Sequence, residues 1–173
     1  MCDGAVRINT KIISMPQMTL TEINEKGSPV GYDKQFELIE SVRSLSKSAS
    51  FVVFSGSLPP GADDSFYYKA GKAVEGGCKI AVDTEGEKLL KTLKLKPALI
   101  KPNIYELEKA SGVNIQNNDD ILYACNILYN KGARLVLVST GSDGAIIYNG
   151  KEAYYAKAPK VEVKSTVGAG DSM

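Results

Sequence analysis

Histidine is absent from the 173 residues, and cysteine occurs only three times. Cys2, Cys78 and Cys125 lie far apart, and no C-x-x-C pair is present. These absences argue against a catalytic triad built on histidine and against a zinc site of thiolates and imidazoles. Scattered cysteines in odd number are typical of reduced thiols, so we expect a cytoplasmic protein in which Cys78 and Cys125 pack in the core.

An excess of charge of either sign is also lacking, with 21 Lys+Arg against 20 Asp+Glu. This balance gives no basic footprint for nucleic acid or for an anionic membrane, although a small anionic substrate needs only a few cations. The longest apolar runs fall well short of the roughly 18–20 residues of a membrane span, and no basic segment precedes an apolar stretch at the N-terminus. We therefore expect no nucleic acid or membrane partner and no targeting segment.

The order of apolar runs and turns predicts alternating strands and helices. Two short strands are expected at 5–13 and 18–24. Later strands are expected at 51–54, 79–83, 98–100, 134–139, 145–148 and 153–156, and helices at 33–47, 64–76, 85–93, 105–111 and 119–131. Repeated strand–helix–strand units predict an α/β fold with a mostly parallel sheet and helices on both faces. The hydrophobic fraction of 43% is sufficient for a core.

Two apolar patterns carry more detailed expectations. The continuous run Phe51-Val52-Val53-Phe54 predicts a strand buried on both faces. In the helix expected at 33–47, apolar residues recur every three positions, which predicts that they form one face. They are Phe36, Ile39, Val42 and Leu45.

A glycine-rich segment near the C-terminus carries the strongest chemical signal, Ser165-Thr166-Val167-Gly168-Ala169-Gly170-Asp171. The glycines allow close backbone approach, and free N–H groups at a helix start face an anion. We expect Gly168, Ala169 and Gly170 to form an anion hole, and Asp171 to act as the general base that takes a hydroxyl proton during phosphoryl transfer. An ordinary turn with a capping aspartate is the alternative.

Four motifs in order resemble those of the PfkB branch of the ribokinase-like carbohydrate kinases, from about Arg7 to Met173. They are S-G-S-L-P-P-G at 55–61, K-P-N-x-x-E at 101–106, S-x-G-x-x-G at 139–144 and T-V-G-A-G-D-S at 166–172. The resemblance implies a ribokinase-like three-layer α/β/α fold with part of a small β lid. The two prolines of the first motif are expected to shape a rigid turn.

The resemblance also implies a site for ATP and Mg²⁺. Its ATP-contacting residues are Ser139, Thr140, Gly141, Ser142, Asp143, Gly144, Lys101 and Asn103. Asn103 and Glu106 lie three residues apart on one helix face, where they could order Mg²⁺-bound waters near the phosphates, with no metal site made of protein ligands alone. The alternatives are a plain hairpin turn at 139–144 and a solvated Glu106 near a helix start.

The segment Arg7-Ile8-Asn9-Thr10-Lys11 resembles the R-I-N-x-K strand of kinases that act on phosphorylated ketohexoses. Arg7 is a candidate for the sugar's phosphate because a guanidinium pairs well with phosphate oxygens, and Lys11 is a second candidate. Both could instead be solvated strand cations. The implied reaction converts fructose 1-phosphate to fructose 1,6-bisphosphate, with tagatose 6-phosphate and fructose 6-phosphate as alternative substrates.

We expect residues 1–30 to form a partial β lid with its connection, and residues 31–173 to form a nucleotide-binding core that is incomplete at its C-terminus. By the same resemblance the chain is expected to be truncated at both ends. A homodimer of the full-length protein is compatible with this expectation. The alternative of another class is a nucleotide-binding fragment without catalytic activity.

Overall fold

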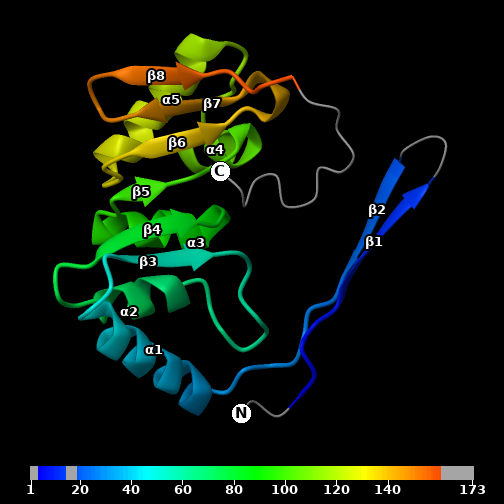
Figure 1. Cartoon of the computed structure of the whole chain (residues 1–173), viewed down its shortest axis with the longest axis vertical. Coiled ribbons are helices and arrows are strands. Elements are labelled where there is room, and N and C mark those ends of the chain that lie inside the picture. The colour runs from blue at the N-terminus through cyan, green and yellow to red at the C-terminus, as the bar shows by residue number, and fades with distance from the viewer. Residues whose placement is uncertain (1–3, 15–18, 161–173) are drawn as a thin grey trace.

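Figure 1 shows a computed structural model in which a narrow β ribbon stands beside a larger sheet. The structure describes residues 4–14 and 19–160. The ribbon pairs β1 (Asn9–Ser14) with β2 (Thr19–Asn24) in antiparallel register. The larger sheet has six strands in chain order, β3 (Phe51–Ser55), β4 (Lys79–Asp83), β5 (Leu99–Ile100), β6 (Val136–Ser139), β7 (Ala145–Tyr148) and β8 (Ala153–Ala156).

The larger sheet is mostly parallel, which confirms the predicted α/β class. Strands β3, β4, β5 and β6 are mutually parallel, and β7 and β8 extend the sheet as antiparallel neighbours. Because parallel strands end at the same edge, the turns after β3, β4, β5 and β6 lie along one side of the molecule. The β1–β2 ribbon stands on that side (Figure 1).

Five α-helices connect these strands, namely α1 (Tyr32–Ser46), α2 (Phe66–Lys72), α3 (Gly86–Thr92), α4 (Ile104–Ser111) and α5 (Asn118–Asn130). Two 3-10 turns, η1 (Leu93–Leu95) and η2 (Gly141–Asp143), complete the described elements. Every predicted helix and strand is found, with bounds that shift by up to about four residues, as is usual at element ends. None of these helices is long and apolar enough to cross a membrane.

Residues that share one face of the sheet form the core with the helices. The strand register places on this face Val52, Phe54, Ile80, Val82, Ile100, Val136, Val138 and Ile146, seven of which are buried. Each helix contacts the next along this face, because right-handed crossovers between strands in sequential order place their helices on the same side. Within residues 4–14 and 19–160 the helices cover this face alone (Figure 1), so the second helix layer expected from the sequence is not seen in the described part of the chain.

The expectation that the Phe51–Phe54 run is buried on both faces is wrong. Phe51 is 52% exposed and Val53 is 62% exposed, whereas Phe54 is 6% exposed. Strand β3 lies at the edge of the sheet, and its outward residues belong to the face that the described helices leave open. Sequence could not separate this edge strand from a central one because the run has no polar alternation.

The four residues predicted to form one apolar face lie in α1, which is a helix as expected, but they do not pack together on one face. Ile39 and Val42 are partly buried, whereas Phe36 is 64% exposed and Leu45 is 68% exposed. A spacing of three residues falls behind the helical repeat of about 3.6, so over nine residues the positions rotate through about 180°. Phe36 and Leu45 therefore lie on opposite sides of the helix.

The cysteines divide between core and turn. Cys125 in α5 is fully buried, as predicted, and burial raises the pKa of its thiol to about 12, which keeps it protonated and unreactive. Cys78 is a free thiol that is only partly buried in the turn before β4, so the prediction that it packs in the core is wrong. Cys2 lies outside the described residues.

Leu128→Ala tests where the core lies. Leu128 of α5 is fully buried, so we expect the substitution to lower the free energy of unfolding by about 2–5 kcal/mol. Leu45→Ala is the matched control and should cost less than about 1 kcal/mol, because Leu45 is largely exposed. Urea denaturation followed by circular dichroism measures both. Equal losses would mean that α1 is packed more tightly than the structure shows.

Candidate functional site

The turn after β3 is fixed at the carboxyl edge of the sheet by hydrogen bonds to β4. The Gly56 amide donates to the Asp83 carbonyl at 2.9 Å, and the Thr84 hydroxyl donates to the Gly56 carbonyl at 2.9 Å. Gly56 has a φ of +84°, a conformation that glycine adopts without strain. The S-G-S-L-P-P-G segment is thus held rigidly at the edge where open α/β sheets bind ligands.

Tyr67 of α2 forms a hydrogen bond to the start of the same turn. Its hydroxyl donates to the Ser55 carbonyl at 2.7 Å and lies 3.3 Å from the Gly56 carbonyl. Burial raises the pKa of Tyr67, with the positive charge of Arg7 acting weakly in the opposite direction. The phenol therefore remains a protonated donor at neutral pH.

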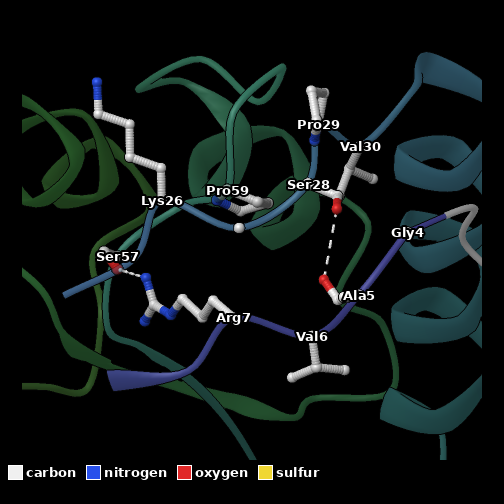
Figure 2. Close-up of a pocket in the computed structure, with 11 residues that line it drawn as sticks. Gly4, Ala5, Val6, Arg7, Lys26, Ser28, Pro29, Val30, Ser57 and Pro59 are labelled. Atoms are coloured by element: carbon white, nitrogen blue, oxygen red, sulfur yellow. Dashed lines mark hydrogen bonds between the residues drawn. The ribbon is translucent and has the colours of Figure 1, made fainter. Parts of the chain in front are cut away.

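Arg7 reaches this turn from the β1–β2 ribbon. Its Nη1 donates to the Ser57 hydroxyl at 2.7 Å, and Figure 2 shows the guanidinium directed at that serine. The two side chains line a cavity of about 470 Å³, whose walls also include Gly4, Ala5, Val6, Lys26, Gly27, Ser28, Pro29, Val30 and Pro59. The structure therefore places a predicted substrate residue, Arg7, in a cavity between ribbon and core.

Arg7 lies before β1 and not within it, although the predicted strand began at residue 5. The amide of Ile8 donates to the Glu25 carboxylate at 2.9 Å. A side chain thus satisfies a donor that a strand partner would otherwise take, and the regular ladder starts at Asn9. The hydrogen bond to Glu25 therefore holds the backbone next to Arg7 outside the regular strand pairing.

Lys11 occupies a different place from Arg7. It pairs with Glu22 directly across the ribbon, at 2.9 Å from Lys11 Nζ to Glu22 Oε1. The hydrogen bond and charge of Lys11 lower the pKa of Glu22. Lys11 does not line the 470 Å³ cavity. Its assignment to substrate stays a prediction that this geometry does not favour.

Ser57 is a functional candidate that sequence reasoning missed. It lines the Arg7 cavity and also a second cavity of about 250 Å³, which Ser55, Asp83, Lys88 and Glu106 border among others. Ser57 therefore borders both spaces. The available signal is a serine in a glycine turn at the end of a strand, a turn in which the sequence predicts a role only for the two prolines.

The K-P-N-x-x-E segment follows β5 along the same edge. Lys101 forms an ion pair with Asp83 at 3.3 Å, and both side chains are largely buried. Asn103 and Glu106 form a capping box at the start of α4, in which each side chain accepts the other's backbone N–H at 2.9 Å. The three-residue spacing thus serves the helix start first.

The capping box is compatible with the predicted role of Glu106 near Mg²⁺. Glu106 uses Oε2 to cap Asn103 and borders the 250 Å³ cavity together with Asp83. In the described part of the chain no group of three or more acidic, cysteine or histidine side chains is placed to hold a metal ion. The expectation that Asn103 and Glu106 order Mg²⁺-bound waters stays a prediction.

The predicted nucleotide loop lies directly beside this segment. Asn103 and Ser139 form a parallel bridge, and the Ser139 amide donates to the Pro102 carbonyl at 3.1 Å. The loop closes on itself when the Thr140 amide donates to the Gly144 carbonyl at 2.9 Å. The structure therefore brings together two of the predicted ATP-contacting motifs, which are 36 positions apart in the sequence from Asn103 to Ser139.

Thr140 and Asp143 also border a cavity of about 390 Å³ that faces the start of α5. Asn117 and Asp120 form a second capping box there. Lys157, which follows β8, lines the same space. The loop therefore borders a cavity on the face of the sheet that the helices cover.

Comparison with known proteins places this geometry in a family. The model of the pfkB family carbohydrate kinase matches residues 4–173. The chain belongs to the pfkB family of carbohydrate kinases. Membership extends over nearly the whole sequence and confirms the resemblance drawn from the four motifs.

Three relatives illustrate the likeness. The chain is 36% identical over 168 residues to 1-phosphofructokinase of Borreliella burgdorferi, covering 96% of this chain and 54% of the relative. It is 33% identical over 171 residues to 1-phosphofructokinase of Bacillus subtilis, covering 98% and 55%. The crystal structure of phosphofructokinase-2 from Escherichia coli in complex with fructose-6-phosphate superposes with a TM-score of 0.83 at 27% identity, covering 94% and 54%.

The pfkB chain described here spans about half the length of the curated relatives it matches. Its fold is ribokinase-like, in agreement with these solved structures. The predicted anion hole and base, Gly168, Ala169, Gly170 and Asp171, lie outside the described residues, so their assignment stays a prediction.

Gly144→Ala tests the nucleotide loop. At a φ of +111°, an added Cβ would overlap the carbonyl oxygen of Ala156 and lie 2.8 Å from the Ala158 nitrogen. We expect a loss of about 3 kcal/mol or more in the free energy of unfolding. Gly141→Ala is the control, since its φ is +64° with no atom within 4 Å, and should cost about 1 kcal/mol. Urea denaturation distinguishes them, and equal costs would contradict the loop geometry.

Proposed function

We propose that the protein is an ATP-dependent kinase that phosphorylates a phosphorylated ketohexose, with fructose 1-phosphate as its substrate. The observation that carries this proposal is the Arg7–Ser57 contact, which places a guanidinium in a cavity at the carboxyl edge of the sheet. A guanidinium matches phosphate oxygens in geometry and charge. The two named 1-phosphofructokinases support the choice of sugar.

In this proposal the two reactants lie along the carboxyl edge of the sheet. The sugar's phosphate contacts Arg7 in the larger cavity, with Ser57 as a neighbouring hydroxyl. The ATP phosphates lie near Lys101 and the Ser139–Gly144 loop, at the same edge of the sheet. Ser57 borders the sugar's cavity and also the 250 Å³ cavity beside Glu106, which supports this side of the sheet as the place where the sugar's reacting hydroxyl meets the γ-phosphoryl group.

The proposed chemistry is a direct transfer. Asp171 takes the proton of the hydroxyl on carbon 6, that oxygen bonds to the γ-phosphorus, and the bond from phosphorus to the bridging oxygen of ADP breaks. The backbone amides of Gly168, Ala169 and Gly170 stabilise the charge on the transferred group. When bound, Mg²⁺ neutralises phosphate charge, and Asn103 with Glu106 would hold its waters. The products are fructose 1,6-bisphosphate and ADP.

Tagatose 6-phosphate and fructose 6-phosphate are the alternative substrates. The similarity to phosphofructokinase-2 bound to fructose-6-phosphate favours the second of these. We also propose the division into a partial lid at 1–30 and a nucleotide-binding core at 31–173. The β1–β2 ribbon and the six strands β3 to β8 form two separate sheets, which supports that division.

Asp171→Asn tests the proposed base. Magnesium-dependent ADP release is measured with fructose 1-phosphate, tagatose 6-phosphate and fructose 6-phosphate in parallel. We expect the highest kcat/KM with fructose 1-phosphate and a loss of roughly 10²–10⁴ in turnover for Asp171→Asn, because the hydroxyl loses its general base. Asp64→Asn, which removes an exposed carboxylate of the turn before α2, is the matched control and should retain the rate.

Full turnover by Asp171→Asn would show that another group takes the proton. Magnesium-dependent ATP binding without ADP release on any of the three sugars would favour the nucleotide-binding alternative over a kinase. A higher kcat/KM for tagatose 6-phosphate or fructose 6-phosphate would keep the kinase and change its substrate.

A further inference from the structure

The cavity beside Arg7 is lined by two charged side chains, and both are cations. Arg7 and Lys26 are the ionisable residues among its described walls, and no carboxylate of residues 4–14 and 19–160 borders it. The remaining described lining is glycine, alanine, valine, proline and serine. Two positive charges with no acid among the described walls favour an anionic ligand.

Lys26 stands opposite Arg7 across the two segments that form the base of the ribbon. Asn9 pairs with Asn24 at the end of the β1–β2 ladder, and the Ser28 hydroxyl donates to the Ala5 carbonyl at 3.4 Å (Figure 2). Residues 7 and 26 fall midway between these two contacts. Like charges at opposing positions of paired segments destabilise the pairing.

Neither cation has an acidic partner among the described residues. Glu25, which precedes Lys26, accepts the backbone N–H of Ile8. The guanidinium of Arg7 bonds to the neutral hydroxyl of Ser57. Lys26 is exposed and has no hydrogen bond or ion pair within residues 4–14 and 19–160. The charge of the two cations is therefore not neutralised by the described part of the protein, which leaves it available to an anion.

The backbone between the two cations brings them close. Gly27 has a φ of +75°, and a Cβ added there would lie 3.3 Å from the Arg7 Cβ, so the two segments touch at this glycine. In Figure 2 the Lys26 side chain extends away from the Arg7 guanidinium. An exposed lysine changes rotamer within nanoseconds, so its ammonium can turn toward an anion held by Arg7.

We infer that Lys26 is a second phosphate-binding residue that determines specificity for phosphorylated over unphosphorylated sugars. This inference rests on the proposed function, because it assigns Lys26 to the same sugar phosphate as Arg7. A phosphate group offers three acceptor oxygens, enough for the planar fork of Arg7 and the single ammonium of Lys26.

Lys26→Gln tests the inference by direct binding. Isothermal titration calorimetry gives the Kd of the 173-residue chain for fructose 1-phosphate and for fructose. We expect Lys26→Gln to raise the Kd for fructose 1-phosphate about tenfold, the effect of losing one charge-assisted hydrogen bond. Its Kd for fructose should not change. Lys26→Arg should restore phosphate-dependent binding, since it keeps the charge and donors.

Two further variants make the outcomes separable. Lys94→Gln removes an exposed lysine in η1. Because η1 precedes β5, Lys94 lies toward the amino ends of the parallel strands, away from the candidate site, and the variant should bind as the unchanged chain does. Arg7→Gln should weaken fructose 1-phosphate binding on the proposed function alone. If Arg7→Gln weakens binding while Lys26→Gln matches Lys94→Gln, the role of Lys26 is wrong and the proposed function stands.

Two other results would also overturn the inference. Equal weakening of fructose and fructose 1-phosphate binding by Lys26→Gln would mean that Lys26 shapes the cavity without contacting phosphate. If the unchanged chain bound none of fructose 1-phosphate, tagatose 6-phosphate and fructose 6-phosphate, the sugar-phosphate site would be wrong, and Lys26 and the proposed function would fail together.

Discussion

Parallel pairing of β3, β4, β5 and β6 is the constraint on which the rest of the structure depends. It brings the ends of four strands to one edge, so turns far apart in the sequence become neighbours. The Gly56–Asp83 and Ser139–Pro102 hydrogen bonds join those turns directly. The helices pack on one face of these strands and contact one another along it. They bury the apolar residues of that face and so hold the strands that carry this edge. The candidate site is a consequence of strand direction as much as of its own residues.

Several motif residues perform a structural task at the site as well as a proposed chemical one. Asn103 and Glu106 close a capping box, and Gly144 fits where a Cβ would meet the backbone after β8. Lys101 is held by Asp83. Such double use positions polar groups accurately, because their rotamers are fixed by helix starts and ion pairs before any ligand arrives.

Much of the fold could be predicted from the sequence, because element type follows from local apolar spacing and turn residues. Strands β4, β7 and β8 match their predicted bounds, and α4 and α5 begin at asparagine caps. Predictions failed where burial depends on distant elements, as at Val53 of the edge strand and Leu45 of α1. The motifs predicted to contact ATP can be recognised in the sequence because their glycines and polar residues are locally distinctive.

By itself the sequence determined the α/β class, the order of elements, the family and the candidate motifs, since each depends on residues near one another in the chain. Only the tertiary structure decided that Ser57 borders two cavities, that Lys11 is paired with Glu22, and that Arg7 and Lys26 share a cavity with no acid among its described walls. Those facts depend on which turns and strands come together in space. That depends on strand pairing and helix packing across the whole sheet, which no local pattern specifies.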